Sequence, residues 1–132
     1  MKTFEKVLER FKAINFAEEF DMIVAIANGG IIPAAILNQR LKIDFQLLKI
    51  HLRDENQKTK YDTPQLMSPI DFKSESKKIL LVDDRIKTGA SIRFAQQLLN
   101  DAAMIKTFAV NGNADYALYN DACFRFPWII QT

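Results

Sequence analysis

The stretch that decides the fold is residues 79–91, which read ILLVDDRIKTGAS. Four apolar residues, typical of a strand covered on both faces of a parallel sheet, run directly into two carboxylates, Asp83 and Asp84. A turn of small residues follows over 88–91, and a helical pattern begins at Ile92. This order of strand, acid pair, turn and helix suits a phosphorylated sugar, whose hydroxyls would meet the carboxylates and whose phosphate would meet the turn.

Hydrophobic periodicity predicts the elements on either side of this stretch. The predicted helices span residues 4–14, 31–41 and 90–103, and the predicted strands span 22–27, 45–52, 78–82, 105–110 and 124–130. Pro127 interrupts the last strand, which would therefore lie at an edge. Alternating strands and helices predict an α/β fold with a parallel sheet, as a single domain over residues 1–132. Ligands of such sheets bind beyond the carboxyl ends of the strands, where both small-residue turns, 28–30 and 88–91, would lie.

The composition excludes several classes of protein. The net charge of +2 is too small to predict a nucleic-acid partner or an acidic membrane surface. No apolar run approaches the ~20 residues of a membrane span. Cys123 is the single cysteine, so no internal disulfide can form and a cytoplasmic location is expected. Its neighbours, Ala122 and Phe124, predict a small buried side chain rather than a nucleophile.

The turn over residues 88–91 has the chemistry of an anion site. The first backbone N–H groups of a helix have no partner within the helix, and the helix dipole favours an anion there. Gly89 and Ala90 allow a phosphate to approach the backbone, and the hydroxyls of Thr88 and Ser91 can donate to its oxygens. An ordinary helix cap by Thr88 or Ser91 explains the turn alone equally well.

The acid pair favours the functional interpretation of this turn. Adjacent carboxylates at the end of a strand repel each other and lose hydration, so they need a cation or hydroxyl donors. A ribose 2′,3′-diol supplies two donors, and Mg²⁺ could be held through water or sugar oxygens. In the alternative interpretation Asp84 only accepts hydrogen bonds from loop amides.

These motifs resemble those of a known family. Residues 79–91 resemble the phosphoribosyl pyrophosphate signature of type I phosphoribosyltransferases, and residues 25–34, AIANGGIIPA, resemble the pyrophosphate-binding turn of that family. The tail over 115–128, with Asp-Tyr and later Phe-Pro-Trp, resembles the hood of small purine-type members. The resemblance covers residues 22–130 in the expected order. It implies the phosphoribosyltransferase fold with a small C-terminal hood at about 111–132.

The resemblance also implies a reaction and its partners. A phosphoribosyl group would pass from phosphoribosyl pyrophosphate to a purine-like nucleobase with release of pyrophosphate, in a homodimer that uses Mg²⁺. The loop at about 53–76 would be a mobile lid.

Residue roles follow from the same resemblance. Asp83, Asp84 and Lys87 would be catalytic, and both aspartates would organise Mg²⁺ indirectly, through water or ribose. The phosphoribosyl group would contact Asp83, Asp84, Ile86, Lys87, Thr88, Gly89, Ala90 and Ser91. Pyrophosphate would contact Asn28, Gly29, Gly30 and Arg53, around a non-proline cis peptide in the turn.

Three positions depart from the family pattern. Lys87 stands where 6-oxopurine enzymes usually carry an aspartate for the purine N7 proton, which weakens a purine assignment. Asn28 is neutral where the family often carries Arg or Lys. Cys123 stands where related hoods place an aromatic residue that stacks on the base, and Tyr116, Phe124 or Trp128 would take that role instead.

The sequence also bears on three alternatives to phosphoribosyl transfer. A receiver domain needs roughly 100 residues after the acid pair, and the chain is too short for that. A nucleoside triphosphatase would carry a phosphate-binding loop of the type GxxxxGK[ST], and the sequence has none. The open alternative is a catalytically weak or inactive regulator that binds phosphoribosyl pyrophosphate or a nucleotide on the same fold.

Overall fold

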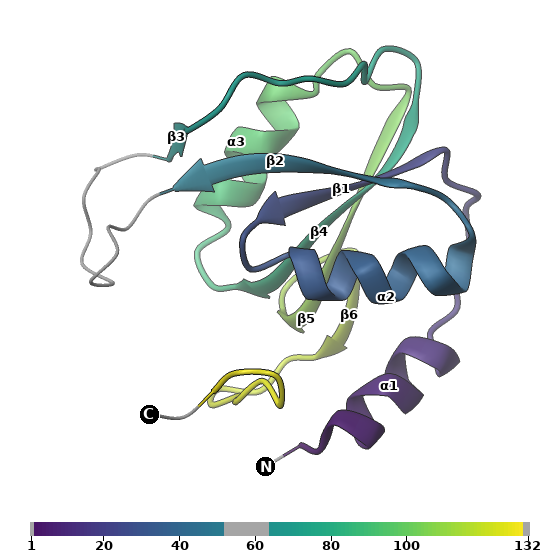
Figure 1. The fold of residues 1–132 in the computed structure, drawn as a ribbon, viewed down its shortest axis with the longest axis vertical. Coiled ribbons are helices and arrows are strands. Elements are labelled where there is room, and N and C mark those ends of the chain that lie inside the picture. Colours follow the sequence, from purple (N-terminus) through teal and green to yellow (C-terminus); the bar gives the residue numbers. More distant parts are fainter. Residues whose placement is uncertain (1, 52–63, 131–132) are drawn as a thin grey trace.

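The computed structural model describes residues 2–51 and 64–130 and shows one sheet with helices on both faces (Figure 1). The helices are α1 Phe4–Ala13, α2 Ile31–Leu41 and α3 Ala90–Leu98, and the strands are β1 Met22–Ala27, β2 Phe45–His51, β3 Gln65–Leu66, β4 Lys78–Ile86, β5 Met104–Gly112 and β6 Tyr116–Tyr119. The strand order is β3-β2-β1-β4-β5-β6. All pairs are parallel except β2 with β3. The predicted α/β fold with a parallel sheet is confirmed.

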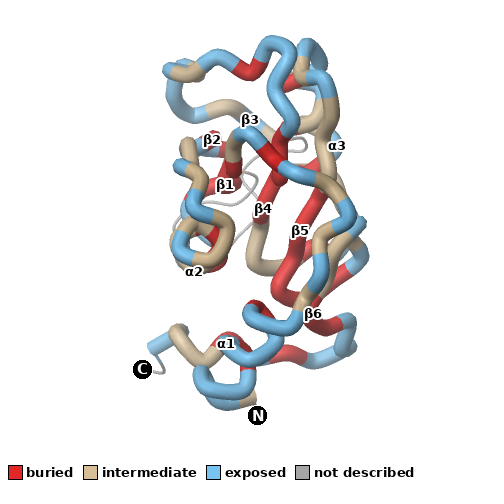
Figure 2. The backbone as a smooth tube through the Cα atoms, turned by 90° about the vertical axis from the view of Figure 1, so that its right-hand side faces the viewer, coloured by how far each residue is buried: buried red, intermediate tan, exposed pale blue. Residues whose placement is uncertain are grey.

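Two hydrophobic clusters cover the two faces of the sheet. Successive residues of β1 and β4 alternate between them, as the period of a strand requires. One cluster joins the sheet to α1, α2 and the C-terminal segment, and the other joins it to α3. The buried residues of β1, β4 and β5 form the centre of the molecule (Figure 2). None of the helices in the described ranges is long and apolar enough to cross a membrane.

Several predicted elements are confirmed. The strand β1 and the helix α2 have the predicted bounds, and α1 begins where expected because the Thr3 side chain accepts a hydrogen bond from the Lys6 amide at 3.2 Å. The predicted lid at about 53–76 falls partly on residues 52–63, which lie outside the described residues, as does Arg53. Residues 64–76 contain β3, which is too short to leave a sequence pattern.

The predicted end of the central strand is wrong. The strand β4 continues through the acid pair to Ile86, since Asp83 pairs with Ala109 and Arg85 pairs with Asn111 of β5. Charged residues at 83–85 conceal this extension, because hydrophobic periodicity ends at Val82. The helix α3 is also shorter than predicted and ends at Leu98.

The predicted last strand, 124–130, is also wrong. The edge strand is β6, and residues 124–130 contain no strand. Phe124, Phe126 and Trp128 alternate along the sequence like strand residues, but they pack as a cluster against the core rather than along a ladder. The packing of every second side chain against the core therefore has the same period as a strand, although the backbone forms none.

Candidate functional site

The two turns predicted to share one edge of the sheet do meet there. A Cβ atom added at Gly29 would lie 2.6 Å from Oδ1 and 2.8 Å from Cγ of Asp84. This close approach follows from the topology, because β1 and β4 are neighbouring parallel strands whose carboxyl ends lie at the same edge. The turn over residues 28–30 therefore lies directly against the acid pair.

The turn after β1 is built around close backbone packing. The Ala27–Asn28 peptide bond is cis, in agreement with the resemblance, and the Gly30 amide donates to the Ile26 carbonyl at 2.8 Å. A Cβ atom at Gly30 would lie 2.4 Å from the carbonyl oxygen of Val82 and 2.9 Å from that of Ile26. Gly30 is thus required for the packing of β1 on β4, whereas Asn28 is exposed and available to a ligand.

The acid pair is electrostatically costly in the described structure. Burial of its carboxyl group, and then the nearby charge of Asp84, raise the pKa of Asp83 well above its usual value. The Asp84 amide donates to Oδ1 of Asp83 at 2.8 Å, and the Arg85 amide donates to Oδ1 of Asp84 at 2.6 Å. Backbone contacts therefore satisfy one oxygen of each carboxylate, but the donors are amides of β4 itself and not the loop amides of the alternative interpretation. Among residues 2–51 and 64–130, no cation lies within salt-bridge distance of either carboxylate.

The turn before α3 presents backbone amides and one cation. Gly89 has a φ of 81°, in the left-handed region, and the Ala90 amide donates to the Thr88 hydroxyl at 3.3 Å. The Arg93 guanidinium donates to the Thr88 carbonyl at 2.9 Å and lies across the turn. Lys87 and Thr88 are exposed. The turn thus offers amides, a hydroxyl and positive charge to an anion.

Comparison with known proteins identifies the family. The model of the phosphoribosyl transferase domain matches residues 3–126. The chain belongs to the phosphoribosyltransferase family. It is 26% identical over 119 residues to the xanthine-guanine phosphoribosyltransferase of Idiomarina loihiensis. The aligned region covers 85% of this chain and 73% of that protein.

Two further phosphoribosyltransferases are similar to the chain. The orotate phosphoribosyltransferase of Pyrobaculum aerophilum is 35% identical over 89 residues, which are 67% of this chain and 42% of that protein. The crystal structure of the purine phosphoribosyltransferase from Pyrococcus horikoshii has a TM-score of 0.77 at 23% identity, covering 99% of this chain and 96% of that chain. The latter likeness establishes the fold.

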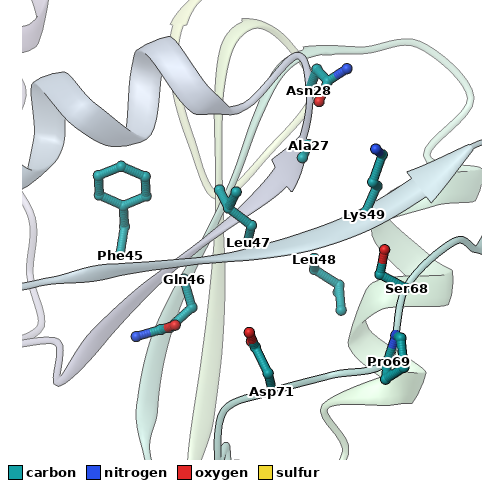
Figure 3. Close-up of a pocket in the computed structure, with 10 residues that line it drawn as sticks. All are labelled: Ala27, Asn28, Phe45, Gln46, Leu47, Leu48, Lys49, Ser68, Pro69 and Asp71. Atoms are coloured by element: carbon teal, nitrogen blue, oxygen red, sulfur yellow. The ribbon is translucent and has the colours of Figure 1, made fainter.

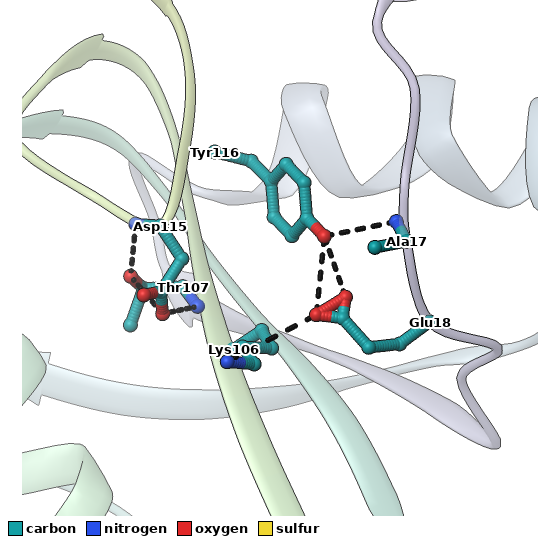
Figure 4. Close-up of polar contacts among 6 residues, drawn as sticks. All are labelled: Ala17, Glu18, Lys106, Thr107, Asp115 and Tyr116. Atoms are coloured by element: carbon teal, nitrogen blue, oxygen red, sulfur yellow. Dashed lines mark hydrogen bonds and ion pairs between the residues drawn. The ribbon is translucent and has the colours of Figure 1, made fainter.

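Tyr116, one of the predicted base-binding residues of this phosphoribosyltransferase, is engaged elsewhere. Its hydroxyl donates to the carboxylate of Glu18 and accepts from the Ala17 amide at 3.0 Å, and Lys106 lies 4.0 Å from Glu18 (Figure 4). The hydrogen bond to Glu18 raises the pKa of Tyr116. Residues 17 and 18 precede β1, so this cluster lies at the amino end of the strand, away from Asp84. The placement favours a structural role for Tyr116.

The other two predicted base-binding rings pack within the protein. Phe124 is buried, with ring centroids 5.0 Å from Tyr119 and 5.1 Å from Phe126. Trp128 is half-buried, stacks on Phe126 at 5.4 Å and meets the edge of Phe4 at 5.8 Å. Both rings are therefore engaged in packing within the protein.

Cys123 is exposed, so the prediction of a buried side chain is wrong. The apolar neighbours of Cys123 do not predict its burial, because the segment forms no strand. Of the two neighbours, Phe124 is buried and Ala122 is exposed.

A pocket of about 350 Å³ adjoins the turn after β1 (Figure 3). Its lining includes Asn28 and Lys49, and Lys49 is in register with Ala27, one residue before the turn. The side chain of Lys49 is exposed at the carboxyl end of β2. Lys49 belongs to no motif, although a lysine near the end of a predicted strand is a usable signal in the sequence. The strand pattern gives no reason to select Arg85.

Proposed function

We propose that the chain transfers the 5-phosphoribosyl group from phosphoribosyl pyrophosphate to a purine-like nucleobase and releases pyrophosphate. The observation that carries this proposal is the contact between Gly29 and Asp84. It brings a pyrophosphate-type turn against an acid pair that continues into an amide-rich turn. Three adjacent sites for diphosphate, sugar hydroxyls and 5′-phosphate match one phosphoribosyl pyrophosphate molecule.

The proposed roles follow from charge. The carboxylates of Asp83 and Asp84 accept hydrogen bonds from the ribose hydroxyls, and the turn over 86–91 holds the 5′-phosphate by its amides. The turn over 28–30 holds the leaving pyrophosphate. Displacement at the anomeric carbon builds positive charge on the ribose and negative charge on the leaving group, which fixed amides and cations stabilise.

The acid pair also suits Mg²⁺. Carboxylate oxygens are hard ligands of the kind that Mg²⁺ prefers, and Asp83 gains most from a nearby cation because its ionised form is disfavoured. The described residues contain no group of three or more candidate metal ligands, so Asp83 and Asp84 would hold the ion together with water or substrate oxygens. When bound, Mg²⁺ neutralises charge on the leaving pyrophosphate.

Lys49 is proposed to supply the cation that the neutral Asn28 does not. Replacing Lys49 by methionine should weaken binding of phosphoribosyl pyrophosphate about tenfold, since a charge-assisted contact to a phosphate is lost. Calorimetric titration in Mg²⁺ measures the change. Ribose 5-phosphate, which lacks pyrophosphate, should bind both proteins equally, and Lys12→Met on the exposed side of α1 should bind like the unmodified protein. Unchanged affinity in Lys49→Met would contradict the role.

The base is proposed to lie near the exposed Cys123 and the backbone of Phe124. The named relatives include purine and orotate enzymes, so the identity of the base is left to experiment. Lys87 is proposed to place positive charge between the phosphate turn and the base. The homodimer and the cytoplasmic location stay predictions.

A two-step experiment tests the proposed function. First, phosphoribosyl pyrophosphate with Mg²⁺ is titrated into the protein and into Asp84→Asn, whose affinity should be at least about tenfold lower. Absence of binding, or equal binding by both proteins, would contradict the proposal. Second, pyrophosphate release is assayed with xanthine, guanine, hypoxanthine, adenine and orotate. Binding without turnover of any base would instead support the regulator.

A further inference from the structure

Arg85 connects β4, the strand that carries Asp83 and Asp84, to the C-terminal segment, residues 120–130. It follows Asp84 in β4, and its guanidinium donates to the carbonyl of Phe124 and lies 5.0 Å from the ring centroid of Phe126. Its Nε is buried and has no hydrogen-bond partner among the described residues. None of the salt bridges in the described part of the chain includes Arg85. This guanidinium is therefore held by one carbonyl and one ring rather than by an ion pair.

The segment that Arg85 holds has little backbone support of its own. Residues 120–130 contain no helix or strand, and their one backbone–backbone hydrogen bond within the described structure joins the Ile129 amide to the Phe126 carbonyl. A second side chain also anchors the segment. The buried Asn111 accepts from the Asp121 amide at 2.8 Å and donates to the Asp121 carbonyl at 3.1 Å.

The two anchors come from one place in the sheet. Arg85 and Asn111 are register partners at the carboxyl ends of β4 and β5. They hold the backbone at residues 121 and 124, on either side of the exposed Cys123. The segment is thus tied by hydrogen bonds to the carboxyl edge of the sheet through two side chains, one of which immediately follows Asp84.

We propose that Arg85 is a positioning residue for the nucleobase, acting through the backbone of residues 123–125; this rests on the proposed function. The planar guanidinium of Arg85 stacks on Phe126 and donates to the Phe124 carbonyl. These two contacts fix both the distance of the segment from β4 and its orientation relative to that strand. The buried, unpartnered Nε indicates that the arrangement is not optimised for stability alone. The acceptor base would then be positioned by the same strand that binds the ribose.

The test is a comparison of Arg85→Met with a matched control. Arg10 makes the same two kinds of contact, lying 4.7 Å from the Tyr119 ring centroid and donating to the Leu118 carbonyl at 3.2 Å, but it belongs to α1. In Arg85→Met the KM for the base that gives fastest turnover should rise about tenfold or more, because the base is misplaced. The Kd for phosphoribosyl pyrophosphate should stay within about twofold. Arg10→Met should lower Tm without changing either constant.

The single tryptophan gives a readout that does not depend on turnover. Trp128 stacks on Phe126, which contacts Arg85, so its fluorescence should shift in Arg85→Met and stay unchanged in Asp84→Asn. If Arg85→Met fails to fold, Arg85→Lys is used, which keeps the charge but loses the planar fork.

The failures of the two proposals are distinguishable. Absence of turnover by the unmodified protein contradicts the proposed function, whatever Trp128 reports. An unchanged KM for the base, or an equal rise in both constants, overturns the positioning role while leaving the proposed function intact. Unchanged fluorescence of Trp128 in Arg85→Met also overturns it.

Discussion

Gly30→Ala is expected to lower the free energy of unfolding by about 3 kcal/mol and Tm by about 10 °C. The added Cβ would meet the backbone carbonyls of Val82 and Ile26, at 2.4 and 2.9 Å. Backbone atoms in the two central strands cannot shift without separating β1 from β4. Thermal and urea denaturation measure the loss.

Gly29→Ala is the matched control for this substitution. The three atoms nearest to its Cβ would all belong to the carboxylate of Asp84, which is the movable end of a side chain. Tm should therefore change by less than about 3 °C, while the affinity for phosphoribosyl pyrophosphate falls because Asp84 is displaced. Equal stability of the two variants would contradict the packing role given to Gly30.

Asp83→Asn is expected to raise stability and to weaken the binding of phosphoribosyl pyrophosphate. The amide avoids the cost of a buried ionised carboxyl beside Asp84, so Tm should rise by about 3 °C, which is about 1 kcal/mol. Affinity for phosphoribosyl pyrophosphate with Mg²⁺ should fall about a hundredfold, since one acceptor and one negative charge are lost. Differential scanning calorimetry and titration calorimetry measure the two effects. The control Asp44→Asn, at an exposed site before β2, should change neither.

The pH dependence of both effects follows from the raised pKa of Asp83. The fold favours the neutral carboxyl, so the stability it contributes is present at about pH 4 and is lost as pH rises through the raised pKa. The Tm advantage of Asp83→Asn should therefore widen between about pH 4 and pH 8. Binding has the opposite dependence, because the ionised form accepts the hydroxyls, and affinity should fall as pH decreases through the same pKa. A constant Tm difference would contradict this account.

The sequence predicted the centre of the fold better than its margins. The strand β1 was predicted correctly because it is a continuous apolar run that ends at the turn over 28–30, and the helix α2 because the apolar residues 31–37 directly follow that turn. The end of β4 was not, since the ladder with β5 continues through charged residues that a hydrophobic pattern does not detect. The C-terminal segment was mistaken for a strand because its core-packed aromatic residues, Phe124, Phe126 and Trp128, alternate along the sequence with the period of a strand.

In the site, too, features set by local sequence were predictable, and features set by tertiary packing were not. Proximity of the turn over 28–30 to Asp84 was predictable, since parallel strands end at one edge. The raised pKa of Asp83 was not predictable from the sequence, because the desolvation of its carboxyl group depends on how β4 and its neighbours pack around it. No local motif selects Lys49 or Arg85, because the placement of Lys49 depends on strand register and the contact of Arg85 is with a distant segment.

The line of rings from Phe126 through Trp128 to Phe4 has a practical consequence for experiments on this protein. It connects the first turn of α1 mechanically to the C-terminal segment that Arg85 anchors. A fluorophore, spin label or surface attachment near Phe4 would therefore report on, and disturb, the region that we assign to the base. Probes meant to be silent belong on the opposite face of the sheet, for example at the exposed Gln97 of α3.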